Sequence, residues 1–348
     1  MNTTINKFNN ILDFNTHYVT QYKSDFRIYY HNIRSLNKKF EETELLITNM
    51  KIDLVILTET WITKGQKKFY NFNGYNSIYS CRQRQGGGLG IFIKNNLEYE
   101  ILENYESEDT SYIIINLNEA KLNVFAIYRP PISNLNEFLN MLDQKINNLS
   151  INNNKCLIIG DLNINLLLQN NNTNLINAIY TSNNFDLCNT SYSTRYSDNR
   201  ESLLDHIVIN FQDSKANLDI IKNSLSDHAI QILSLNLSKK YNSRLKSNKI
   251  TTKLNYKSLR SKLNILIERT SNENIDTDDL YDLIIDAFNS SMYNKTIKLQ
   301  NNTKPWFNEK IYYLIKQRDY YFYRKKDFPD NKYIKNAYNN YNNLVKKR

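Results

Sequence analysis

The stretches DLVILTE at residues 53–59 and CLIIGDLN at residues 156–163 decide the fold. Each is a continuous apolar run that ends abruptly in acidic or amide side chains. Such a run predicts a short strand buried on both faces, because a strand with one face in water alternates apolar and polar residues. Glu59 and Asp161 each follow directly after a strand end, which is where α/β sheets bind ligands.

Outward from these two runs, short apolar strands alternate with amphipathic segments. Further strands are predicted at 26–31, 75–80, 89–94, 111–117, 122–128, 204–210 and 229–235, and helices at 38–50, 137–149 and 174–184. Asn134 or Asn136 is suited to cap the helix at 137–149. This order predicts one α/β domain of two packed sheets flanked by helices.

Charge is distributed unevenly along the chain. The 348 residues include 45 basic and 35 acidic side chains, a formal net charge of +10. Residues 1–240 hold about 23 basic and 24 acidic side chains, whereas residues 241–348 hold about 22 and 11. Helical periodicity at 254–268, 277–290 and 309–346, without a β pattern, predicts a helical extension. Its positive charge indicates a polyanionic partner or, alternatively, an ordinary solvated face.

Several classes of protein are excluded by composition. The three cysteines are far apart and form no CxxC pair, which excludes a disulfide scaffold or zinc finger and fits a reducing compartment. No apolar run reaches the roughly 18 residues of a membrane span, and no signal-peptide pattern is present. We therefore expect a nuclear or cytoplasmic protein with no membrane partner. Residues 1–25 are predicted to be a poorly ordered leader.

Polar side chains flank nearly every strand of the predicted domain. Each one alone is an ordinary loop, turn or cap residue, but side chains beyond the strand ends converge on one edge of an α/β sheet. Carboxylates, amides, a phenol and one histidine without cysteine suit Mg²⁺, with Mn²⁺ as the alternative, rather than zinc. The residues are Asn32, Glu59, Tyr128, Asp161, Asn163, Asp205, Asp227 and His228.

Two other motifs are interpreted as structural. Gly86, Gly87 and Gly88 lack the GK[ST] ending of a phosphate-binding loop and lead into a strand, so we predict a tight turn. His206 and His31 adjoin Asp205 and Asn32, and adjacent strand residues point to opposite faces. Neither histidine is assigned a role, and His17 lies outside the predicted domain.

Seven ordered segments carry a family resemblance. They resemble the endonuclease domain of non-LTR (LINE-like) retrotransposons, in the exonuclease–endonuclease–phosphatase superfamily, over about residues 26–237. ETW, YRPP and GDLN together are closer to the retroelement branch than to the repair or phosphoinositide branches. The resemblance implies a four-layer, two-sheet sandwich flanked by helices, with a C-terminal basic helical extension. The segments are RIYYHNIRSL, DLVILTETW, QGGGLGIFIK, VFAIYRPP, LIIGDLNIN, LLDHIVI and LSDHAI.

The resemblance continues into the extension. Residues 304–348 resemble the basic helical linker that follows the endonuclease in such elements, so 238–348 is predicted to be a linker region preceding a reverse transcriptase. The sequence has no YxDD-like motif and ends at Arg348. We expect a truncated open reading frame or a fragment, with a reverse transcriptase acting in cis or in trans.

The resemblance also implies which residues bind the divalent ion and the DNA. Glu59, with Asn32 beside it, would hold the divalent ion, and Asp227 would be a further acidic ligand. Arg129 would contact a DNA phosphate.

The implied catalytic residues form a second set. Asp161 would be the general base for water, and His228 would lie against a non-bridging phosphate oxygen. Asp205 would hold His228 in the required tautomer. Asn163 would position the phosphate, and Tyr128 would donate a hydrogen bond to it.

The predicted function is therefore Mg²⁺-dependent nicking of DNA, which leaves a 3′-OH primer for target-primed reverse transcription. The basic C-terminal region would add affinity for DNA, and for RNA. One alternative is another phosphodiesterase or phosphatase of the superfamily, acting on a phosphoinositide, sphingomyelin or RNA end. Another is a catalytically idle nucleic-acid-binding relic. The aromatic residues of the extension would stack on bases or, alternatively, form the core of a helical pair; they are Tyr312, Tyr313, Tyr320, Tyr321, Phe322 and Tyr323.

Overall fold

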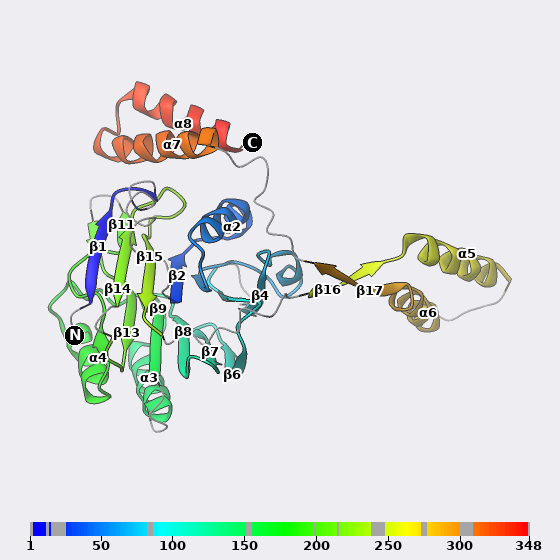
Figure 1. Cartoon of the computed structure of the whole chain (residues 1–348), viewed down its shortest axis with the longest axis horizontal. Helices are drawn as coiled ribbons and strands as arrows, with labels where there is room; N and C mark the ends of the chain where they lie inside the picture. Colours follow the sequence, from blue (N-terminus) through cyan, green and yellow to red (C-terminus); the bar gives the residue numbers. More distant parts are fainter. Residues whose placement is uncertain are drawn as a thin grey trace. The chain divides into compact units, whose positions relative to one another are not determined.

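The structure is a computed structural model and describes residues 3–11, 14, 26–81, 86–150, 155–197, 200–213, 216–237, 248–272, 277–298 and 309–346. His17 lies outside these residues. The chain divides into two compact units, one of Met1–Tyr241 with Lys304–Arg348 and one of Asn242–Thr303 (Figure 1).

The first unit is built on two mixed sheets. The seven-stranded sheet has the order β1 (Thr4–Phe8), β14 (Asn217–Ile221), β15 (Ile230–Leu235), β2 (Phe26–Asn32), β3 (Leu54–Thr58), β5 (Leu89–Lys94) and β4 (Tyr75–Ser80). The six-stranded sheet has the order β10 (Asp186–Leu187), β13 (Asp205–Ile209), β9 (Lys155–Asp161), β8 (Leu122–Tyr128), β7 (Ser111–Leu117) and β6 (Tyr99–Glu106).

The two sheets pack face to face, and helices cover their outer faces. The inner core joins side chains of both sheets, such as Ile56 and Ile159. Helix α2 (Phe40–Asn49) packs on the outer face of the seven-stranded sheet. Helices α3 (Leu135–Ser150) and α4 (Asn171–Ser182) pack on that of the six-stranded sheet. The predicted fold class, a four-layer, two-sheet sandwich with flanking helices and a helical C-terminal region, is confirmed.

Shorter elements complete the first unit. The short helices η1 (Asn37–Lys39) and η2 (Lys67–Phe69) lie in the connections, and β11 (Arg195–Ser197) and β12 (Arg200–Ser202) form a hairpin. Asn134 caps α3, because its Oδ1 accepts from the backbone N–H groups of Asn136 and Glu137. The three cysteines are buried and form no disulfide among the described residues. No helix among the described residues has the length and apolar content needed to cross a membrane.

The strand directions bring the predicted site residues to one edge. Strand β2 runs parallel to β3, and β8 runs parallel to β9. Strands β13 and β15 run antiparallel to β9 and β2, so both begin where their neighbours end. The carboxyl ends of four strands and the amino ends of two therefore meet at the same edge of the sandwich.

Two glycine positions are needed to build this edge. A Cβ at Gly160, just before Asp161, would lie 1.8 Å from the carbonyl oxygen of Ile127, so only glycine allows β8 and β9 to approach this closely. Gly88 ends a run with positive φ, and its carbonyl accepts from the N–H of Thr60 at 3.3 Å. The glycine run is thus the tight turn that the sequence predicts, and it supports the chain after Glu59.

The first described residues differ from the predicted leader. Thr4–Phe8 form β1, an edge strand that pairs in parallel with β14. The side-chain amide of Asn6 donates to Asn217 and Asp219 of β14, in both cases at 2.9 Å. Because Asn217 and Asp219 interrupt the apolar pattern of β14, sequence reasoning missed that strand and its partner together.

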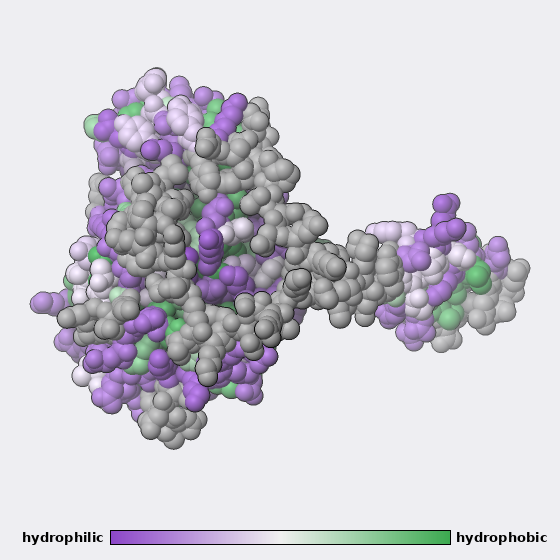
Figure 2. Space-filling view, viewed as in Figure 1, coloured by the Kyte–Doolittle hydropathy of each residue, from purple (hydrophilic) through white to green (hydrophobic). Residues whose placement is uncertain are grey.

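The extension contains two parts. The second unit runs β16 (Asn248–Leu254), α5 (Tyr256–Asn272), α6 (Thr277–Asn289) and β17 (Met292–Lys298), with the two strands paired antiparallel. The strands replace part of the helix-only pattern predicted for this segment. Apolar side chains of its helices are exposed, such as Ile265 and Ile267 at 60% and 63%. Figure 2 shows hydrophobic residues at the surface of this unit.

Helices α7 (Glu309–Asp327) and α8 (Lys332–Lys346) form a hairpin that belongs to the first unit. Tyr321 stacks on Tyr341 with ring centroids 5.6 Å apart, and Phe322 packs on Tyr338. These contacts favour the helical-pair core for Tyr321 and Phe322. Tyr313 and Tyr320, by contrast, are half-exposed. The side chain of Tyr312 lies outside the described part.

Candidate active site

Asn32 at the end of β2 joins the two sheets. Its Nδ2 donates to Oε1 of Glu59 at 3.0 Å and to Oδ2 of Asp161 at 2.7 Å. Glu59 follows β3 of the same sheet, whereas Asp161 ends β9 of the other sheet. Two carboxylates from different sheets are therefore held by one amide, at the edge where the strand-end residues were predicted to converge.

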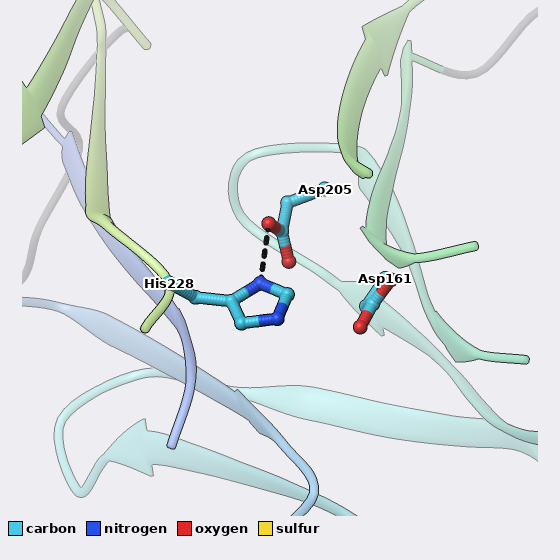
Figure 3. A group of neighbouring side chains, drawn as sticks. All are labelled: Asp161, Asp205 and His228. Atoms are coloured by element: carbon cyan, nitrogen blue, oxygen red, sulfur yellow. Dashed lines mark hydrogen bonds and ion pairs between the residues drawn. The ribbon is translucent and has the colours of Figure 1, made fainter. Parts of the chain in front are cut away.

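His228 and Asp205 make a second contact across the sheets. Nδ1 of His228 lies 2.8 Å from Oδ2 of Asp205, and the two side chains are 3% and 0% exposed. Figure 3 shows the imidazole beside this carboxylate, with Asp161 nearby. The Tyr30 hydroxyl donates to the other oxygen of Asp205 at 2.7 Å. Both Asp205 oxygens are therefore bound, which fixes the ring of His228.

The charge state of the pair follows from its surroundings. Burial alone would lower the pKa of His228, but attraction to Asp205 and the hydrogen bond between them raise it to about 9. Burial opposes ionisation of Asp205, yet His228 holds the pKa of that carboxyl below its usual range. An imidazolium with Nδ1 committed to Asp205 keeps Nε2–H as a donor at neutral pH.

Asp161 is nearly fully buried. Burial first, and repulsion from Asp205 second, raise its pKa to about 7. The backbone N–H of Asn163 donates to its Oδ1 at 3.0 Å, which fixes the orientation of the carboxylate. A carboxyl that titrates near neutral pH suits a general base.

The donor set fits a hard divalent cation. Oxygens of Asp161 and Asp205 lie within 4.8 Å of one another and of a ring nitrogen of His228, and because the imidazolium can only donate, the oxygens are the available ligands. Glu59 adds a further carboxylate, because it accepts from the same amide as Asp161. Carboxylate oxygens gathered at a buried position bind hard cations such as Mg²⁺, and a cation would offset the cost of ionising Asp161 there.

Asp227 has a different arrangement from the predicted metal ligand. Its Oδ2 accepts from Arg34 at 2.9 Å and from Arg195 at 3.0 Å. Burial would raise its pKa, but His228 and the two arginines lower it to about 2. Because two guanidinium groups share this oxygen, the structure gives Asp227 arginine partners where a metal was predicted.

Arg129 likewise differs from the predicted phosphate contact. It is 4% exposed, and its guanidinium donates to the backbone oxygens of Leu162 and Asn163 at 2.7 and 3.1 Å. It also donates to Ser133 at 3.0 Å. The guanidinium therefore stabilises the turn after β9, because its donors satisfy buried carbonyls there.

Tyr128 and Asn163 lie beside Asp161, as predicted. Tyr128 ends β8 opposite Asp161 in the parallel ladder and is 4% exposed. Asn163 has φ 51° and donates through Nδ2 to the carbonyl of Arg129 at 2.8 Å. Both residues therefore adjoin Asp161 through the backbone, Tyr128 by its strand register and Asn163 by its N–H group.

The backbone around the cluster is strained. Among the described residues, eight non-glycine residues have positive φ, including Arg34, Glu59, Trp61 and Asn163 at this edge. Such conformations cost of the order of 1 kcal/mol each and persist where surrounding contacts impose them. Hydrogen bonds from Ser35 to Glu59 and from Trp61 to Gly87 impose them here.

Sequence reasoning missed three residues that complete the cluster. Tyr30 and Arg34 were detectable, because each lies two positions from Asn32, and Tyr30 shares its face of β2. Arg195 lies on a short hairpin strand with no distinctive pattern.

The other histidines have structural contacts. His206 lies between the Tyr180 hydroxyl and the Ile164 carbonyl, away from the cluster. Burial lowers the pKa of His31 to about 3, so it is neutral and donates through Nε2 to the backbone oxygen of His228 at 3.2 Å.

Comparisons with known proteins show the family of the chain. The model of the Endonuclease/Exonuclease/phosphatase family matches residues 29–228. No curated protein matches the chain.

Solved structures with a similar fold include the endonuclease domain of TRAS1, a telomere-specific non-LTR retrotransposon, at 14% identity and TM-score 0.47, covering 62% of this chain and 100% of that one. An AP endonuclease from Archaeoglobus fulgidus matches at 15% identity and TM-score 0.49, covering 61% and 99%. A 3′ phosphatase from Neisseria, bound to a product DNA hairpin, matches at 11% identity and TM-score 0.47, covering 61% and 99%.

Proposed function

The chain belongs to the Endonuclease/Exonuclease/phosphatase family, and we propose that it is a divalent-metal-dependent endonuclease that nicks DNA. The observation that carries the proposal is the buried cluster in which Asn32 joins Glu59 to Asp161 while Asp205 holds His228. In this proposal residues 26–237 are the hydrolase, and 238–348 are a basic extension.

The proposed reaction is hydrolysis of a phosphodiester by water. Asp161 accepts the proton of the attacking water, for which a pKa of about 7 is well matched. His228 donates from Nε2 to a non-bridging phosphate oxygen and offsets the charge that develops there. Asp205 holds the ring and stabilises its positive charge. Tyr128 and Asn163 position the phosphate.

A divalent ion, Mg²⁺ or Mn²⁺, would be held by Glu59 with Asn32 beside it, and when bound it neutralises charge on the phosphate and on the leaving 3′-oxygen. Asp161, which accepts from the same Asn32 amide as Glu59, would act as the general base for the attacking water. The acidic cluster supports a hard cation in general, and the choice of Mg²⁺ is part of the proposal.

We also propose a retroelement origin for the protein. It is supported by ETW at residues 59–61, YRPP at 128–131 and GDLN at 160–163, each at the end of a strand of the site. In this role the nick supplies a 3′-OH primer, and a reverse transcriptase acts in cis or in trans. The basic C-terminal residues would contact the DNA and the RNA template.

A second candidate is another phosphodiesterase or phosphatase of the same family. It is favoured by the family itself, which includes phosphatases, and by the chemistry of the core. A carboxylate base, an imidazolium and a cation serve any phosphate ester.

Nicking of supercoiled plasmid tests the proposal. The full chain with Mg²⁺ is expected to produce relaxed circles whose ends a DNA polymerase extends directly, and EDTA is expected to abolish the reaction. Asp161→Asn and His228→Gln should each lose at least about a thousandfold in rate. Asp186→Asn, an exposed aspartate on β10, is the matched control and should nick like the wild type.

Three outcomes would contradict the proposal. Equal nicking by Asp161→Asn and the wild type would exclude this site as the source of activity. Hydrolysis of phosphomonoesters or phospholipids without nicking would favour the second candidate. DNA binding without hydrolysis of any ester would favour an idle binding protein.

A further inference from the structure

Helix α7 contacts the loop that carries His228. The hydroxyl of Ser224 donates to the carboxylate of Asp319, and the hydroxyl of Tyr323 donates to the backbone oxygen of Asn223 at 2.7 Å. Nζ of Lys326 donates to the carbonyl of Tyr196 at 2.9 Å, on the strand that also carries Arg195. We call the contacts of Arg318, Asp319, Tyr323 and Lys326 with the sandwich the α7 interface.

The α7 interface contains a buried ion cluster. Arg318 and Asp319 are 4% and 1% exposed. The guanidinium of Arg318 makes two hydrogen bonds to the carboxylate of Glu42 on α2, at 2.9 and 2.7 Å, and also donates to Asp319 at 2.8 Å. Charges this deeply buried are tolerated only when they are paired in a defined geometry. The docking of α7 is therefore specific.

Hydrogen bonds continue from the α7 interface to His228. Nδ2 of Asn223 donates to the backbone oxygen of His228 at 3.0 Å. Oδ1 of Asn223 accepts from the N–H groups of Leu225 and Ser226, at 2.9 and 3.3 Å. Asn223 thus organises the whole turn, and its own backbone is held by Tyr323. A displacement of α7 would move the turn and, with it, the imidazole of His228.

The turn before His228 and helix α7 together line a small crevice beside His228. It is formed by the turn and its neighbours Tyr196 and Lys222 on one side, and by Phe322, Tyr323 and Lys326 of α7 on the other. α7 is therefore in direct contact with the segment that ends in the imidazole, although it follows His228 by about a hundred residues.

We propose that α7 is a positioning element of the active site, with Asp319 and Tyr323 as positioning residues that act on His228 through Ser224 and Asn223. This inference rests on the proposed function, because it assigns α7 a part in the same reaction. A reacting group displaced by about 1 Å costs about a hundredfold in rate. The basic extension would then determine the turnover of the sandwich as well as its affinity for DNA.

The competing interpretation is that α7 only stabilises the fold. The two roles are separated by kcat and KM of the full chain, together with hydrogen exchange of the segment at 222–229. Asp319→Asn removes the charge but keeps the shape, and Tyr323→Phe removes one hydroxyl. Tyr320→Phe is the matched control, because it removes the same hydroxyl from an exposed tyrosine of the same helix.

A positioning role predicts a fall in kcat of about tenfold or more for Asp319→Asn and Tyr323→Phe, with KM for plasmid changed less than about threefold. Exchange at 222–229 should be faster by about fivefold, and circular dichroism should show an intact fold. Tyr320→Phe should match the wild type in each measurement.

The remaining outcomes overturn one proposal or the other. Unchanged kcat in both variants, with or without faster exchange, would overturn the positioning role. If the wild type hydrolyses no phosphate ester, the proposed function fails, and exchange alone then decides this inference. Faster exchange in both variants would support the coupling of α7 to the turn, and unchanged exchange would overturn it.

Discussion

At the α7 interface, Arg318 and Asp319 are 4% and 1% exposed, and at the sheet edge Asp161 and Asp205 are 1% and 0% exposed. The two regions bury charge equally but compensate it differently. Arg318 lies between the carboxylates of Glu42 and Asp319 and donates hydrogen bonds to both, so each charge of this cluster directly contacts a group of opposite charge. At the sheet edge, several carboxylates surround the imidazole of His228, and the pKa of Asp161 rises to about 7.

Buried charge therefore has two different consequences in this molecule. A compensated cluster holds two elements together, whereas an under-compensated cluster retains the capacity to take a proton or a cation. Substitutions at the sheet edge should therefore affect turnover, and substitutions at the α7 interface should affect stability as well as turnover. The four predictions below test this contrast, beginning with the largest effect.

Asp205→Asn should have the largest effect, a fall in kcat of about 10³–10⁴-fold, equivalent to about 4–5.5 kcal/mol. An amide cannot stabilise the imidazolium of His228, although it keeps the shape and still accepts from Tyr30. Single-turnover nicking at pH 7.5 measures the effect. At this pH it should also lose about 2 kcal/mol of unfolding free energy, because the charged Asp205 stabilises the imidazolium of His228 in the folded state. A kcat within threefold of the wild type would contradict the role of the pair.

Arg318→Met should reduce the free energy of unfolding by about 3–5 kcal/mol, because it leaves Asp319 and Glu42 near one another without their cation. Urea unfolding of the full chain measures this. Arg324→Met on the same helix is the control, since Arg324 is exposed, and should change stability by less than about 0.5 kcal/mol. Adding Glu42→Gln and Asp319→Asn to Arg318→Met should recover most of the loss, and failure to recover would contradict the compensated-cluster interpretation.

The stability contributed by the His228–Asp205 pair should depend on pH. The folded-state pKa of His228 is about 9, above the usual 6.5, so the folded state binds the proton more tightly. This contribution, about 3 kcal/mol for a shift from 6.5 to about 9, is fully present below pH 6.5 and is lost as pH rises through about 9. The difference in unfolding free energy between the wild type and His228→Gln, followed in EDTA from pH 6 to pH 9.5, should shrink accordingly. A constant difference would refute it.

Exposed lysines of the hairpin should have the smallest effect. Residues 304–348 include 12 basic and four acidic side chains, and Lys332, Lys335 and Lys346 of α8 are exposed. Changing these three lysines to Gln should leave kcat unchanged and weaken DNA binding by less than about 1 kcal/mol each. The slope of log K for DNA binding against log salt concentration should also become less steep, by up to about 0.9 for each lost phosphate contact. Binding titrations at several salt concentrations measure this, and an unchanged slope would show that α8 does not contact DNA.

Much of the sandwich was predictable because its strands are short apolar runs with abrupt polar ends. The strands around Ile56 and Ile159 were placed within one or two residues, and the residues that follow them do converge. The edge strands were not predictable. Strand β1 depends on Asn6 bonding to β14, and β6 carries a largely polar, exposed pattern that resembles a loop.

The residue types that gather at the candidate site were predicted from the strand ends, and the roles given to them stay predictions. Asn32, Glu59, Asp161, Asp205 and His228 form the cluster that the strand ends indicated. The partners of Asp227 and Arg129 were not predictable, because they depend on which donors and carbonyls the loops bring within hydrogen-bond distance.

By itself, the sequence determined the two-sheet architecture, the edge where the polar residues meet and the chemical type of the site. These properties follow from local patterns, because hydrophobic periodicity and strand ends are written along the chain. The pairing of His228 with Asp205, the two arginine partners of Asp227 and the docking of α7 on the turn before His228 were visible only in three dimensions. Those contacts join residues far apart in the sequence, and their energies depend on burial and distance, which no local pattern records.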